Sequence, residues 1–232
     1  MQNDNIIYDD SKAGLTAFYN KIYAIMGMGV LVSALVSWVM ISFFSNTLIS
    51  IIQTGGFAFF LLWLIPMFLV FPMQGAAMKN SPMALPLFIG FAGFFGFLVS
   101  FTLLMYKAEN IAIAFVTAAG MFVALSAYGR VTKRNLSGMG KAMMAALIGV
   151  IIASLVNYFV GSPAIMYLIS FISVIIFSGL IAWDNQKIEQ VYNSVNGQVQ
   201  DGWAISMALS LYLDFINLFL SLLRIFGMGS RD

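Results

Sequence analysis

Seven long blocks of apolar residues divide this chain, with short polar connections between them. Each block approaches or exceeds the length of about 20 residues that a helix needs to cross the hydrocarbon core of a bilayer. The apolar residues fill all sides of each block instead of one helical face, which indicates that lipid surrounds them. The predicted spans are residues 22–44, 55–73, 83–106, 111–128, 142–159, 165–183 and 203–223.

A closed β-barrel is the alternative way to cross a membrane. Its strands alternate between apolar and polar residues over about ten positions, whereas residues 57–71 do not alternate. The sequence therefore predicts an all-α integral membrane protein, with one domain over residues 1–232 that forms a bundle of seven transmembrane helices. Residues 1–17 lack the basic start of a secretory signal and are predicted to form a cytoplasmic tail.

Composition limits the chemistry that such a bundle can perform. Of the 232 residues, 61% are hydrophobic and 9% are charged, and the chain contains neither cysteine nor histidine. Disulfides, thiolate nucleophiles, thiolate or imidazole zinc sites and histidine proton relays are therefore excluded. The net charge of +2 is too small to indicate a nucleic-acid partner. We expect neither an enzyme nor a bound cofactor.

The distribution of basic residues predicts the orientation in the membrane. The densest cluster, Arg130, Lys133, Arg134 and Lys141, lies between the fourth and fifth spans. Because basic loops stay in the cytoplasm, this cluster places the amino terminus there as well. The side of the carboxyl terminus stays open: the length of residues 203–223 favours a full crossing, but a last segment that turned back would also fit the charges.

One face of the last span is polar. Its members are Ser206, Ser210, Asp214, Asn217 and Ser221, which follow one another at intervals of three or four residues. At about 100° per residue, they form a stripe less than a quarter-turn wide. The serines and the asparagine are explained by hydrogen bonds between helices. A carboxylate in hydrocarbon costs about 2.5–3.5 kcal/mol on insertion scales, so Asp214 indicates a function.

A second carboxylate, Asp184, lies at the cytoplasmic end of the sixth span. It shares a helical face with Ser170 and Ser173, which suggests that this face also looks into the bundle. An ordinary charge at a helix end remains an equally good explanation of Asp184.

Three polar motifs in the second half of the chain resemble the Bax inhibitor-1 family of membrane proteins. They are residues 127–140 (AYGRVTKRNLSGMG), residues 179–188 (GLIAWDNQKI) and residues 208–227, which include ALSLYLDFINLF and LLRIFG. They occur in the order that the family shows. The first half of the chain resembles the family in hydropathy and helix number alone.

This resemblance implies a bundle with its carboxyl-terminal helix at the centre. It also implies a pH-sensitive leak of cations, usually calcium, gated by aspartates that match Asp184 and Asp214. A bacterial-type member would lie in the inner (cell) membrane. The family's basic residue on an early helix is absent from the core of the second span, and Lys79, beyond the cytoplasmic end of that span, is the nearest substitute.

The residues suggest how such a leak would work. Two carboxylates about 4 Å apart would repel by about 4 kcal/mol at an effective dielectric near 20, so they would titrate as a unit and could sense pH. We expect Asp184 and Asp214 to bind calcium weakly, and Asp214, Asn217, Ser210 and Ser206 to line the ion pathway. Lys79 or Arg130 is the predicted counter-charge of Asp184.

Other functions fit the sequence less well. An intramembrane aspartyl protease has a Gly-x-Gly before its second aspartate, whereas residues 211–213 here are Leu-Tyr-Leu. A light-driven pump requires a lysine in the last span, and residues 203–223 contain none. The remaining alternative is a non-conducting regulator that binds a membrane-bound protease or a channel. Ion flux through the purified protein would distinguish it from a leak channel.

Overall fold

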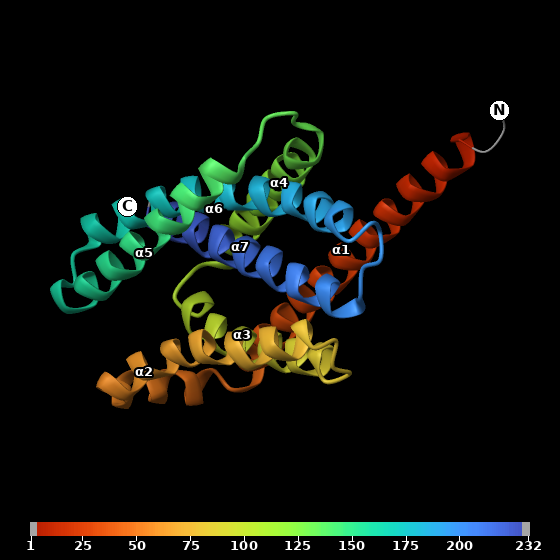
Figure 1. Cartoon of the computed structure of the whole chain (residues 1–232). Coiled ribbons are helices and arrows are strands. Elements are labelled where there is room, and N and C mark those ends of the chain that lie inside the picture. The colour runs from red at the N-terminus through yellow and green to blue at the C-terminus, as the bar shows by residue number, and fades with distance from the viewer. Residues whose placement is uncertain (1–3, 229–232) are drawn as a thin grey trace. The chain divides into compact units, whose positions relative to one another are not determined.

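Seven helices form the chain in the computed structural model, which describes the backbone of residues 4–228 and the side chains of residues 12–54, 56 and 61–227 (Figure 1). They are α1 (Asp4–Phe43), α2 (Ser45–Met78), α3 (Ala84–Leu103), α4 (Ala108–Val131), α5 (Ser137–Val160), α6 (Pro163–Ser194) and α7 (Asp201–Met228). Each contains a segment long and apolar enough to cross a membrane, and residues 4–228 contain no strand. The predicted fold class is confirmed: this is a multi-pass α-helical membrane protein.

Two helix ends differ from the predictions. Residues 4–17 belong to α1, ahead of the predicted start of the first span at residue 22, and α6 continues to Ser194, beyond the predicted end of the sixth span at residue 183. The apolar blocks mark the part of a helix that lies in lipid, whereas backbone hydrogen bonds can continue beyond it. At the end of α6, packing favours this continuation of the helix. The buried ring of Tyr192 packs against Phe18 of α1, with 6.0 Å between the ring centroids.

The second helix also begins earlier than predicted, at Ser45 instead of residue 55. It contains a break at Gly56, whose φ of 43° and ψ of −127° lie outside the helical region. Glycine adopts such a positive φ at little cost because it has no Cβ. The part of α2 that qualifies as a span is Leu61–Met78, and Leu48 before the break packs with Leu98 and Phe101 of α3.

Two compact units make up the chain. The first contains Met1–Tyr106 and Tyr192–Tyr212, and in it α1 packs along α3. The two helices approach closely at Gly96, where a Cβ would lie 2.5 Å from the carbonyl oxygen of Ser33. Tyr212 of α7 lies in the core of this unit, with its ring in edge-to-face contact with Phe88, Phe91 and Phe95.

The second unit contains Lys107–Val191 and Leu213–Asp232. Its core joins α4 to α7 through edge-to-face contacts of Phe115 and Phe122 with Phe215, at 5.7 and 5.8 Å. In the most apolar window of α5 no residue is buried, whereas 78% of the corresponding window of α7 is buried. The buried share of α7 exceeds that of the other six spans, and α5 presents its apolar surface to lipid.

Candidate acidic site

The polar stripe of α7 contains one carboxylate, Asp214, whose side chain is 6% exposed. Its Oδ2 is buried and has no hydrogen-bond partner in the part of the chain that the structure describes. A buried polar atom without a partner is uncommon in folded proteins and requires an explanation. Asp214 is therefore the residue of the stripe at which we expect a proton or a cation to bind.

The other members of the stripe with assigned hydrogen bonds use their donors within the protein. Ser206 donates to Oε1 of Gln74 on α2 at 2.7 Å, in the first unit. Asn217 donates to the carbonyl oxygen of Leu213 at 2.8 Å, and Ser221 donates to that of Asn217 at 2.7 Å. These bonds fit the interpretation of the stripe as polar packing. The roles of Ser206, Ser210 and Asn217 in an ion pathway stay predictions.

The second carboxylate, Asp184, is partly buried on α6 in the same unit as Asp214. The two carboxylates interact electrostatically, and Asp184 is the charged neighbour that acts on Asp214. On the face that Asp184 shares with two serines, Ser170 and Ser173 are buried and donate to the carbonyl oxygens of Met166 and Ile169. The structure thus places the two aspartates within range of an electrostatic interaction, and direct contact between their carboxylates stays a prediction.

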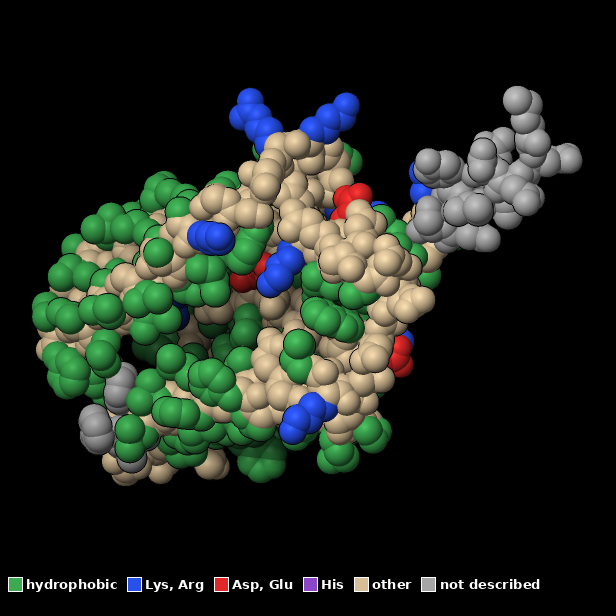
Figure 2. Space-filling view, viewed as in Figure 1, with side chains coloured by type: hydrophobic (Ala, Val, Ile, Leu, Met, Phe, Trp, Pro, Cys, Tyr) green, Lys and Arg blue, Asp and Glu red, His purple; other side chains and the backbone are tan. Residues whose placement is uncertain are grey.

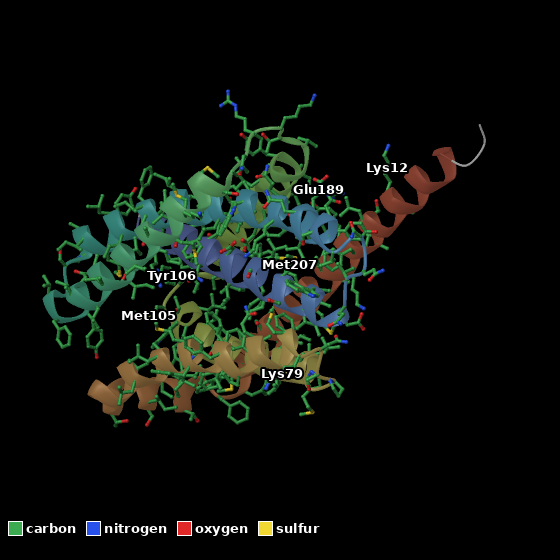
Figure 3. The ribbon with its side chains drawn as sticks, viewed as in Figure 1. Lys12, Lys79, Met105, Tyr106, Glu189 and Met207 are labelled. Atoms are coloured by element: carbon green, nitrogen blue, oxygen red, sulfur yellow. The ribbon has the colours of Figure 1, made fainter. Side chains whose placement is uncertain are left out.

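The basic neighbour that acts on Asp184 is Lys187, three residues further along α6. The Lys187 ammonium lies 5.2 Å from the centre of the Trp183 ring, and its side chain is exposed. The spacing of three residues on one helix could have revealed this pair from the sequence. The counter-charges predicted from the sequence were Lys79 and Arg130 instead. Arg130 is exposed in the last turn of α4, and Lys79 extends from the end of α2 (Figure 3), so their assignment as counter-charges stays a prediction.

Two residues that follow Asp184 hold this part of α6 in place, a role that was not predicted from the sequence. Asn185 is buried and donates to Oγ of Ser126 on α4 at 3.0 Å. Gln186 accepts a hydrogen bond from the Leu136 N–H and donates one to the Arg134 carbonyl oxygen, both at 2.8 Å. Their place in the motif DNQ, at the end of the predicted sixth span and next to apolar residues, was the available signal. The partners depend on which helices pack together, which the sequence does not reveal.

Within the described residues there is no cluster of three or more acidic, histidine or cysteine side chains that could hold a metal ion. Calcium takes six to eight oxygen ligands, so the two aspartates would supply part of a coordination shell and water or neutral oxygens the rest. Oγ of Ser178, on α6, is a second buried oxygen without a described partner and belongs to the same unit. This chemistry suits weak binding of a partly hydrated cation.

Seven apolar helices with an acidic pair in the interior of one unit define a multi-pass membrane protein with a polar site in its helical core. The family described as inhibitor of apoptosis-promoting Bax1 matches residues 15–231. This chain belongs to that family, the Bax inhibitor-1 family, and the resemblance seen in the three sequence motifs is confirmed.

Bacterial relatives match along almost the whole chain. A protein designated YrjE from Lactococcus lactis is 63% identical over 234 residues, which cover 100% of both chains. A membrane protein of Streptococcus pyogenes serotype M3 is 53% identical over 97% of this chain and 98% of its own. The inner membrane protein YbhL of Escherichia coli is 37% identical over 97% of each chain.

Proposed function

We propose that this protein is a pH-sensitive cation leak channel of a bacterial inner (cell) membrane, that calcium is among the ions it passes, and that Asp184 and Asp214 gate it. The observation that carries this proposal is the buried carboxylate of Asp214, with an unpartnered Oδ2 and a like charge as its neighbour. The amino terminus lies in the cytoplasm in this proposal, because the basic α4–α5 loop stays inside.

A carboxylate in this position has two ways to lower its free energy. It can bind a proton, which it can share with Asp184, or it can bind a cation, which compensates both negative charges. Two interacting carboxylates titrate as a unit, so acid favours the shared proton and a higher pH favours the cation. Competition between the proton and the cation at one site makes the leak depend on pH. Weak binding is required, because an ion that binds too tightly does not leave.

The experiment is calcium flux into sealed vesicles that contain the purified full chain and an internal calcium indicator, measured from pH 5 to pH 8. We expect a steep change of the flux with pH in the native protein. Asp214→Asn keeps the shape of the side chain and removes its charge, and it should abolish most of the flux. Asp201→Asn is the matched control, because Asp201 is an exposed carboxylate on the same helix, paired with Lys21.

A flux that is the same at every pH would reject the gate. The absence of any flux from the native protein would instead favour the alternative function, a non-conducting regulator that binds a membrane-bound protease or a channel. The two results are distinguishable, because the first leaves a calcium signal above that of protein-free vesicles and the second does not.

A further inference from the structure

The loop between α4 and α5 carries charge that its own segment does not compensate. Lys133 and Arg134 of the loop are exposed, as is Lys141 near the start of α5, and no aspartate or glutamate occurs between Glu109 and Asp184. Basic side chains project from this loop in Figure 2. On the adjoining turns of α6, Asp184 has Lys187 as its basic neighbour, and Glu189 is partly buried. The loop therefore presents an excess of positive charge to its surroundings.

The backbone of this loop is held against α6. Gln186, which is 9% exposed, binds both the Leu136 N–H and the Arg134 carbonyl oxygen through its side-chain amide. Two local hydrogen bonds add to this, from the Arg134 N–H to Oγ1 of Thr132 at 3.3 Å and from the Ser137 N–H to Oδ1 of Asn135 at 2.9 Å.

Glycines on both sides of the loop bring the flanking helices against α6. A Cβ at Gly129 would collide with the carbonyl oxygen of Ala182, and one at Gly140 would collide with the Trp183 ring. The charged side chains thus extend from a backbone whose conformation is fixed. A ligand that binds them has less ordering to impose, which favours binding.

Apolar side chains lie next to these basic residues on the helices that leave the loop. Val131 is 76% exposed, Met144 is 48% exposed and Ile148 is 61% exposed. Tyr128, 47% exposed, lies one turn before the loop, where an amphipathic ring suits the boundary between headgroups and acyl chains. Basic charge above an apolar helix surface matches a ligand that has an anionic headgroup and hydrocarbon chains.

We propose that Lys133, Arg134 and Lys141 form a binding site for the phosphate-containing headgroup of an anionic phospholipid, whose acyl chains lie along α4 and α5. Gln186 positions the loop through the hydrogen bonds of its side-chain amide to the loop backbone. The proposal does not depend on ion conduction. It differs from general attraction to a negative membrane, because it requires the loop conformation as well as the charges.

The test starts from the full chain, delipidated in a neutral detergent and titrated separately with phosphatidylglycerol, phosphatidylcholine and inorganic phosphate. Native mass spectrometry measures the retained lipid. We expect the native protein to retain phosphatidylglycerol in preference to phosphatidylcholine. The triple variant Lys133→Gln/Arg134→Gln/Lys141→Gln should bind phosphatidylglycerol on the order of a hundredfold more weakly, because each basic side chain near the surface contributes substantially to anionic lipid binding.

The control variant Lys12→Gln/Lys79→Gln/Lys107→Gln removes three exposed basic residues outside this loop and should bind phosphatidylglycerol like the native protein. An equal loss in this control would overturn the site, because net charge would then explain the binding. Complete displacement of the lipid by millimolar phosphate would overturn it as well, in favour of a site for a free anion.

Gln186→Ala tests whether the conformation of the loop matters for lipid binding. It removes the hydrogen bonds that hold the loop backbone and retains every basic charge. We expect several-fold weaker binding of phosphatidylglycerol, and unchanged binding would overturn the role of the loop conformation. Circular dichroism verifies that each variant is folded. If the triple variant does not fold, Lys133→Gln and Arg134→Gln replace it as single variants, and retention of full lipid preference in both would contradict the proposal.

Discussion

Tyr212 and Asp214 are buried polar residues only two positions apart on α7, yet their environments differ. Tyr212, which is 0% exposed, belongs to the core of the first unit, and its hydroxyl lies 2.7 Å from Oγ of Ser33. Asp214 belongs to the second unit and has an unpartnered Oδ2 and a like charge as neighbour. One residue is satisfied by the fold, and the other is not.

This difference separates a structural polar group from a functional one. A hydrogen-bonded tyrosine in an apolar core stabilises one arrangement of α7 against α1, and its removal should reduce stability. An unsatisfied carboxylate contributes little to folding, since the desolvation of a charge is costly. Its presence is explained by a proton or a cation that binds there. Substitution of Tyr212 should therefore change the stability of the protein, whereas substitution of Asp214 should change the ion flux.

The largest expected effect is that of Asp214→Asn on the leak. Interactions with a charged group are worth about 1.5–3 kcal/mol, so the flux should fall roughly ten- to a hundredfold. The unfolding temperature in detergent should not fall, because the variant removes a buried charge without removing a bond. A clear loss of stability with unchanged flux would show that Asp214, like Tyr212, has a structural role and no role in the leak.

Asp184→Asn should change the pH dependence of the leak more than its maximum. Asp214 loses the like charge with which it shares a proton, so the midpoint of the flux–pH curve should move by roughly one pH unit or more. The measurement is the same vesicle flux, carried out on both single variants and on the double variant. Two single variants that match the native curve would exclude both aspartates from the gate.

Ser33→Ala tests whether the hydrogen bond between Ser33 and Tyr212 stabilises the fold. The Ser33 hydroxyl lies 2.8 Å from the Ala92 carbonyl oxygen and 3.0 Å from that of Gly29. We assign the single Ser33 proton to one of these carbonyl oxygens and the Tyr212 hydroxyl as donor to Oγ of Ser33, because this assignment leaves both hydroxyl protons paired. Alanine at position 33 leaves the buried Tyr212 hydroxyl without an acceptor, which costs about 1–3 kcal/mol. Chemical unfolding in detergent measures this loss, and an unchanged midpoint would show that Tyr212 finds another partner.

The sequence predicted what bilayer thickness and helical periodicity determine. The seven apolar blocks gave the number of spans, and the spacing around Asp214 gave the polar face of α7, because both follow from local geometry. The break at Gly56 and the extension of α6 to Ser194 were missed, since hydropathy does not report where backbone hydrogen bonding ends.

The partners of the polar residues were also missed. Gln74, Ser33 and Gln186 are ordinary polar residues in the sequence, and each acquires its role from a helix that is distant along the chain. Sequence periodicity places a side chain on a face but does not say which helix packs there. Contact between Asp184 and Asp214 was left open for the same reason, because it depends on how α6 lies against α7.

Tyr212→Phe should have the smallest effect, and it gives the sharpest form of the comparison. It removes the donor and leaves Ser33 with a carbonyl acceptor for its own proton, so no buried donor is left unpaired. The edge-to-face contacts with Phe88, Phe91 and Phe95 are retained by a phenylalanine ring. We expect the free energy of unfolding to fall by about 0.5–1.5 kcal/mol, the net contribution of one hydrogen bond, and a flux–pH curve like that of the native protein.

Unfolding of Ser33→Ala, Tyr212→Phe and the double variant completes the test. The double variant should be no less stable than Ser33→Ala, because it removes the orphaned hydroxyl; a sum of the two single losses would contradict a direct bond between these side chains.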